Sequence, residues 1–138
     1  MIKVAIAGYF DPIHEGHLDH IEAAKALGDW LVVIAGTEKQ CDKKHGRHFH
    51  SWEGKVRVLK KLGADEVVPS VLDENGTCAP VLRLVRPDIY AKGDDFSASN
   101  VLPEAERVAC IDIGCRVILG CGKRLNHSNR FWSREIGA

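Results

Sequence analysis

The chain has 138 residues, of which 45% are hydrophobic and 28% charged, the composition of a globular protein long enough for one domain with its own core. Its 19 basic and 19 acidic residues cancel, so the charge balance does not point to a nucleic-acid or membrane-surface partner. No apolar run approaches the roughly 18 residues that a membrane span needs. The N-terminus leads straight into an apolar run rather than a signal peptide. We therefore expect one cytoplasmic domain over residues 1–138.

Apolar runs and helical patterns alternate along the chain. Residues 2–7 are a short apolar run typical of a buried strand, and the helical spacing of Leu18, Ile21, Ala24 and Leu27 ends at Gly28. Further strands are predicted at 31–35, 64–69, 87–91 and 116–119, and further helices at 52–62, 79–85, 104–109 and 126–136. This alternation predicts an α/β fold: a Rossmann-like three-layer sandwich with a five-stranded, mostly parallel sheet and helices on both faces.

The strand ends indicate where a ligand would bind. Gly8, Thr37, Lys92 and Gly120 each follow a predicted strand. In a parallel sheet these ends meet at the carboxyl edge, which is where open α/β sheets bind ligands.

The cysteines are odd in number and lack paired spacing. None of the five forms a Cys-x-x-Cys pair with another (Cys41, Cys78, Cys110, Cys115 and Cys121). This pattern predicts reduced thiols, as in a cytoplasm, rather than a disulfide framework.

Two histidines follow the first predicted strand. His14 and His17 are three residues apart, so on a helix their side chains project about 60° from each other on one face. Gly16 between them would let a phosphate approach the backbone, where the first amides of a helix lack intrahelical partners. Two neighbouring imidazoles can donate hydrogen bonds to oxygens of one phosphorus as charge builds. The alternative is a pair of surface or capping histidines.

The pattern Gly8-x-Phe10-Asp11-x-x-His14-x-Gly16-His17 resembles the signature of the cytidylyltransferase-like nucleotidyltransferases, whose His-x-Gly-His motif binds the triphosphate. The resemblance runs along most of the chain and is nearest to the glycerol-3-phosphate cytidylyltransferase type. The adenylyltransferase domain of ADP-heptose synthesis is similar too. The resemblance implies catalytic roles for the two histidines and nucleotide-binding roles for Gly8, Tyr9, Phe10, Asp11 and Gly16.

Residues 39–50 are basic with almost no apolar content, so we expect a loop, and this loop resembles a second part of the family pattern. Lys44 falls on the first of two family lysines, Gly46 and Arg47 replace the second, and the segment 50–53 matches a His-Ser-Tyr-Glu type. Lys55 stands where the family usually has an arginine that binds the phosphate substrate. We therefore expect Lys44 to be catalytic and Arg47, Lys55 and Trp52 to bind substrate. The alternative is a solvated surface loop.

Two later segments complete the resemblance. Residues 86–95 resemble the second family block and imply nucleotide contacts from Lys92, Gly93 and Asp94, where Gly-Asp-Asp favours CTP over ATP. In the last family motif the hydroxyl chemistry is kept only at Ser128, with Asn126 as a cap. Either these two bind the nucleotide, or that role has moved to Lys123, Arg124 and Arg130.

The resemblance implies transfer of CMP from CTP to a small phosphorylated or phosphonate acceptor, with release of pyrophosphate. Mg²⁺ is expected to be held mainly by the triphosphate, without a dedicated protein site, and the chain is expected to form a homodimer. Three alternatives stay open: an adenylyltransferase using ATP on a sugar phosphate such as a heptose phosphate, a non-catalytic nucleotide-binding module, and a zinc protein. The zinc reading has ligand types in Cys41, His45, His48 and His50 but no supporting spacing.

Overall fold

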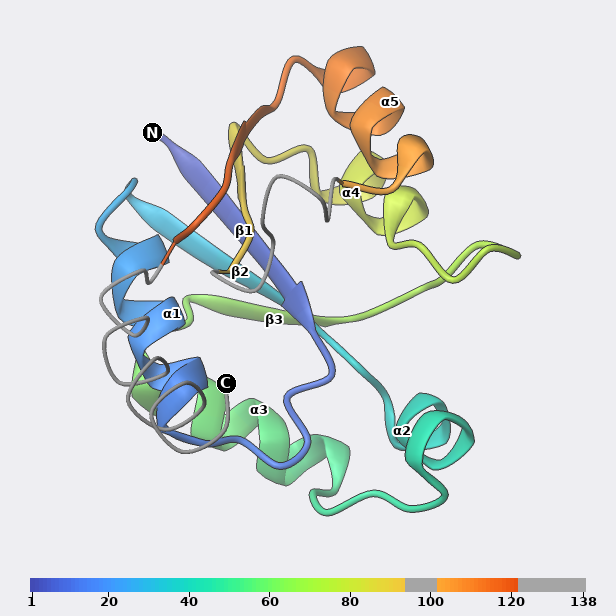
Figure 1. The fold of residues 1–138 in the computed structure, drawn as a ribbon. Coiled ribbons are helices and arrows are strands. Elements are labelled where there is room, and N and C mark those ends of the chain that lie inside the picture. Colours follow the sequence, from blue (N-terminus) through green and yellow to red (C-terminus); the bar gives the residue numbers. More distant parts are fainter. Residues whose placement is uncertain (94–101, 122–138) are drawn as a thin grey trace, which may run out of the picture.

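The computed structural model describes residues 1–93 and 102–121, in which a five-stranded sheet carries helices on both faces (Figure 1). The strands lie in the order β3-β2-β1-β4-β5, and every neighbouring pair is parallel. Their bounds are β1 Lys3–Gly8, β2 Trp30–Ala35, β3 Glu66–Pro69, β4 Ile89–Ala91 and β5 Arg116–Ile118. The predicted Rossmann-like fold is confirmed, and its described strands are wholly rather than mostly parallel.

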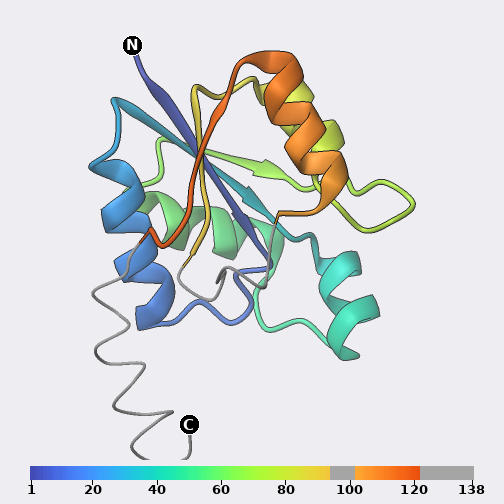
Figure 2. The ribbon, with the colours of Figure 1, turned by 45° about the horizontal axis from the view of Figure 1, so that its top comes forward.

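Helices cover the sheet because its strands are apolar on both sides. The helices are α1 Glu15–Lys25, α3 Trp52–Leu62, α4 Ala79–Val85 and α5 Glu104–Ile113. In β1, Val4 and Ile6 belong to the core cluster with α1 and α3, whereas Ala5 between them belongs to the cluster with α4 and α5. This alternation follows the two-residue period of a strand. Figure 2 shows the resulting three layers.

A further helix, α2 (Glu38–His45), lies beyond the carboxyl end of β2, where the sequence predicted a loop (Figure 1). Thr37 and Gln40 form a capping box at its start, and Gly46 ends it with a left-handed φ of 83°. Its side chains are mostly exposed, and the buried one is Cys41. The loop prediction was wrong because so short a helix outside the layers needs no apolar stripe.

The order of the strands reverses between β1 and β4, which places a ligand crevice at the carboxyl edge between them. Among the described residues, no helix has the length and apolar character required to cross a membrane. The predicted helix over 126–136 lies outside the described residues.

Candidate functional site

His14 and His17 lie together where the loop after β1 enters α1. His14 is the N-cap of α1 with extended backbone, so it is not itself helical as the spacing had suggested. The two rings are stacked with centroids 3.9 Å apart and an angle of 26° between their planes. The ring of Phe10 lies against His17 at a centroid distance of 4.8 Å. The structure therefore brings the two predicted imidazoles together at this junction.

Backbone hydrogen bonds orient both rings. Nδ1 of His14 accepts from the Gly16 amide at 3.0 Å, and Nδ1 of His17 accepts from the His14 amide at 3.1 Å. A ring nitrogen that accepts carries no proton, so each neutral ring carries its proton on Nε2. The Gly16 amide is thus paired with His14, and each ring can offer a phosphate its Nε2–H.

The environment of His17 keeps its ring neutral. Burial lowers its pKa to about 4, and the neighbouring His14, His20 and Lys55 add to the effect. A neutral imidazole can donate one hydrogen bond at Nε2 at neutral pH. This arrangement suits stabilisation of a charged oxygen rather than storage of a permanent positive charge.

We expect this shift to make the folded chain less stable in acid. The pKa of His17 is lower in the folded chain than in the unfolded one, so the unfolded state binds more protons between pH 6.5 and about 4. The free energy of unfolding should therefore fall as the pH drops through this window. His17→Asn should remove that contribution. Urea unfolding of the unmodified chain and of His17→Asn at pH 7.5 and 4.5 gives the loss of unfolding free energy between the two pH values for each chain. We expect a smaller loss in His17→Asn, and an equal loss in both chains would contradict the prediction.

Two glycines make room for aromatic rings. A Cβ on Gly16 would lie 2.8 Å from Cε1 of His14, so any side chain there would displace the ring. A Cβ on Gly8 would lie 3.2 Å from the Phe10 ring. Phe10 itself is 2% exposed and has a φ of +52°, so it supports His17 from the core instead of facing a nucleotide. Packing against these rings therefore restricts both motif positions, and Gly16 more strictly than Gly8.

The position of Lys55 differs from the substrate-binding position that the sequence predicted. Its side chain is 1% exposed, and its ammonium donates to the carbonyls of Tyr9 and Gly36, each at 2.8 Å. The Lys55 ammonium also lies 3.4 Å from Oδ2 of Asp11. The expectation that it binds substrate was wrong, because the charge is used inside the protein to join the ends of β1 and β2.

Asp11 ties two loops together. Its carboxylate accepts from the Phe49 amide at 2.6 Å and the His50 amide at 3.3 Å, and its side chain is 1% exposed. Burial alone would raise the pKa of Asp11, but these amides and Lys55 outweigh it and lower the pKa. His50 in turn accepts from the Ile13 amide at 3.1 Å through Nε2. The structure thus places Asp11 under the histidine loop, where its hydrogen bonds are with the protein.

The other two residues predicted to bind substrate make contacts within the protein. The guanidinium of Arg47 stacks over the exposed ring of Phe49 at 4.5 Å. Trp52 packs half-buried against the core under α3, and its amide donates to Glu38 at 2.8 Å. Neither residue lines the cavity described next.

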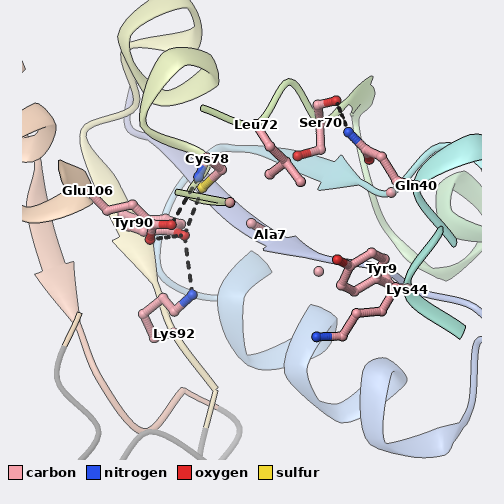
Figure 3. A pocket seen from close by; sticks show the side chains of 13 residues that line it. Ala7, Tyr9, Gln40, Lys44, Ser70, Leu72, Cys78, Tyr90, Lys92 and Glu106 are labelled. Atoms are coloured by element: carbon pink, nitrogen blue, oxygen red, sulfur yellow. Dashed lines mark hydrogen bonds between the residues drawn. The ribbon is translucent and has the colours of Figure 1, made fainter. Parts of the chain in front are cut away.

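A cavity of about 560 Å³ lies at the carboxyl edge of the sheet (Figure 3). Lys44 of α2 and Lys92 after β4 enter it from opposite sides in this view, and Tyr9 lies beside Lys44. Gly8 is the fourth predicted site residue in its lining. The remaining lining residues are Ala7, Gly36, Gln40, Ser70, Leu72, Gly76, Cys78, Tyr90 and Glu106.

The cavity and the histidine pair lie on either side of the end of β1. Phe10, next to His17, belongs to the core cluster under α1 and α3, whereas Cys78 and Tyr90 belong to the cluster under α4 and α5. Gly8 and Tyr9 stand between the two regions. The arrangement suits two ligands that meet across the end of this strand.

Sequence reasoning missed the polar end of the cavity. Glu106 is 5% exposed and accepts from the Tyr90 hydroxyl at 2.9 Å and the Cys78 amide at 3.0 Å. The signal was present, because Glu106 shares the buried face of α5 with Ala109 and Cys110 at helical spacing. An acidic residue in that stripe indicates a polar partner inside. Gly93 ends the described segment, while Asp94, Asn126 and Ser128 lie outside the described residues.

A zinc site was one of the alternatives that the sequence left open. Over 1–93 and 102–121, no three or more His, Cys, Asp or Glu side chains are grouped so as to hold a metal ion. Cys41, one of the suggested zinc ligands, is fully buried with its sulfur 3.6 Å from the Lys55 ammonium. The zinc reading therefore finds no support in the described part of the chain.

Comparison of the sequence with known proteins finds related nucleotide-handling proteins. The family model described as cytidylyltransferase-like matches residues 5–112. The FAD synthase of Thermococcus sibiricus is 38% identical over 110 residues, which cover 77% of this chain and 73% of that protein. The bifunctional protein HldE of Streptomyces coelicolor is 38% identical over 104 residues, 74% of this chain but 22% of HldE. The chain thus spans about a fifth of the HldE relatives it matches.

The fold is also found among solved structures. The lipopolysaccharide core biosynthesis protein of Thermoplasma volcanium superposes with a TM-score of 0.66 at 24% identity, covering 86% of this chain and 95% of that one. This similarity concerns the fold alone, whereas the family match also covers the histidine motif. The chain therefore belongs to the cytidylyltransferase-like family of nucleotidyltransferases.

Proposed function

We propose that the chain transfers AMP from ATP to a small phosphorylated acceptor and releases pyrophosphate. The observation that carries the proposal is the stacked pair His14 and His17, each with Nδ1 occupied by a backbone amide and Nε2 left to donate. Two such donors suit the oxygens of a triphosphate better than a single surface imidazole does.

The reaction needs no protein nucleophile. An oxygen of the acceptor phosphate attacks the α-phosphorus of ATP, a new P–O bond forms, and the bond to the leaving pyrophosphate breaks. The protein then contributes positioning and charge stabilisation. In this proposal His14 and His17 donate to the triphosphate, and Lys44 in the cavity attracts the acceptor phosphate.

Relatives favour ATP over the CTP that the sequence favoured. FAD is an adenine dinucleotide, so the name of the FAD synthase relative indicates adenylyl chemistry. Residues 8–17 also resemble the adenylyltransferase domain of ADP-heptose synthesis. The preference for CTP rested on the run Gly93-Asp94-Asp95, whose two aspartates lie outside the described residues. We therefore take the adenylyl alternative as the proposal, with a sugar phosphate as the acceptor.

Magnesium enters the proposal as part of the substrate. Both oxygens of Asp11, which lies in the loop before the histidines, are engaged with Phe49, His50 and Lys55. Triphosphate oxygens and water are the ligands that Mg²⁺ prefers. The reacting nucleotide is accordingly the magnesium complex of ATP. The homodimer and the cytoplasmic location stay predictions from the sequence.

Pyrophosphate release tests the proposal. The chain is incubated with magnesium and ATP, CTP, GTP or UTP, each with and without a panel of sugar phosphates, glycerol-3-phosphate, phosphoethanolamine and a phosphonate. We expect acceptor-dependent release that is about tenfold or more faster with ATP than with CTP. Faster release with CTP would overturn the choice of nucleotide. Tight nucleotide binding without release from any acceptor would favour the non-catalytic module.

A further inference from the structure

A buried carboxylate stands at the end of the cavity away from Lys44. Glu106 lines the cavity from α5, and Figure 3 shows it grouped with Tyr90 and Cys78. A carboxylate can accept about four hydrogen bonds. The Tyr90 hydroxyl and the Cys78 amide supply two of them, one to each oxygen. Glu106 therefore keeps capacity to accept from a ligand in the cavity.

The charge of Glu106 is balanced within the same group of side chains. The Tyr90 hydroxyl lies 2.9 Å from Glu106 and 3.2 Å from the Lys92 ammonium. Burial and the neighbouring Cys78 and Glu106 raise the pKa of Tyr90, so the hydroxyl keeps its proton. The hydroxyl consequently donates to the carboxylate and accepts from the ammonium. The three side chains form a connected group with one negative and one positive charge.

This balance discriminates between kinds of acceptor. A hydroxyl could donate to Glu106 without adding charge. A second ammonium, as in an aminoalkyl phosphate, would bring a positive charge close to Lys92, and Glu106 is the one carboxylate among the lining residues that the structure describes. A plain alkyl group would separate the carboxylate from water without offering it a donor.

We propose that Glu106 is a specificity-determining residue that accepts a hydrogen bond from a hydroxyl of the acceptor, so that the enzyme selects phosphorylated polyols. This inference rests on the proposed function. In it, the acceptor phosphate lies towards Lys44 and Gly8, and the hydroxylated part of the acceptor reaches Glu106, Tyr90 and Cys78.

Selectivity tests the role of Glu106. The ratio of kcat/KM for a sugar phosphate to that for propyl phosphate is measured in the unmodified chain, in Glu106→Gln and in Glu104→Gln. Glu104 is the matched control, because it lies on the same helix with its side chain exposed and paired with Arg107. We expect Glu106→Gln to lower the ratio about tenfold or more and Glu104→Gln to leave it unchanged. Equal losses for both acceptors would assign Glu106 a structural role and overturn the proposal.

Binding to the unmodified chain provides a second test, which needs neither a variant nor turnover. Calorimetry compares a sugar phosphate, its deoxy analogues, propyl phosphate and phosphoethanolamine. We expect the sugar phosphate to bind most tightly and at least one deoxy analogue to bind about tenfold more weakly. Tighter binding of phosphoethanolamine, or equal binding of all four, would overturn the inference. Selective binding without pyrophosphate release would instead refute the proposed function and leave the inference standing.

Discussion

Replacing His14 and His17 together by alanine is expected to lower pyrophosphate release by about 10³-fold or more, because removing one well-placed donor to a developing charge typically costs about 10²–10³-fold. The loss should fall on kcat, since the charge on the phosphate oxygens grows in the transition state. The single replacements should not add up to the double one. The rings stack on each other, so the loss of either ring removes packing from the other.

Two further variants separate chemistry from folding. His14→Asn removes the ring but keeps a side-chain oxygen that can cap α1. It should retain the stability of the helix and still lose activity. His48→Ala changes an exposed histidine whose ring contacts Asp42, and it should leave turnover unchanged. Undiminished turnover of the folded double variant would refute the role of the imidazoles.

The layers of the fold were predictable because burial dictates the pattern. β1 and β2 are apolar on both faces, so they form continuous apolar runs in the sequence. In the amphipathic α3, the spacing of Leu59 and Leu62 indicates the buried face. Strand ends then had to meet at one edge, which is where the cavity lies. The sequence therefore indicated the region of the site without any knowledge of side-chain positions.

Local hydrogen bonding was harder to foresee than burial. The helix α2 buries one side chain, so a search for apolar periodicity missed it. Its Thr37-x-x-Gln40 capping box and its Gly46 end signal were nevertheless in the sequence. Similarly, the closeness of His14 and His17 follows from a capping arrangement rather than from two helical positions. Capping chemistry deserves the same weight as periodicity at such junctions.

Long-range pairing of charges could not be predicted from one sequence. Lys55 and Asp11 are far apart along the chain, and nothing local to either indicates that they meet inside the protein. Glu106 and Tyr90 likewise come from different elements. A lysine within an amphipathic helix normally reaches solvent, so an exposed side chain available to substrate was the reasonable expectation for Lys55.

Lys55 is held in place by several groups inside the protein. Its ammonium satisfies two carbonyls at the ends of β1 and β2 and lies beside the buried carboxylate of Asp11. Asp11 then holds the amides of Phe49 and His50. Removing the ammonium would leave a buried negative charge and two buried carbonyls with a lost donor.

We expect Lys55→Met to lower the free energy of unfolding by about 3–5 kcal/mol, the usual cost of removing one partner from a buried ion pair. The double variant Lys55→Met, Asp11→Asn should be more stable than Lys55→Met alone, because it removes the uncompensated charge. Lys60→Met is the matched control on the exposed side of α3 and should change stability by about 0.5 kcal/mol at most. Urea unfolding followed by circular dichroism measures all three. If Lys55→Met were no more destabilising than Lys60→Met, the ammonium would not hold the strand ends together.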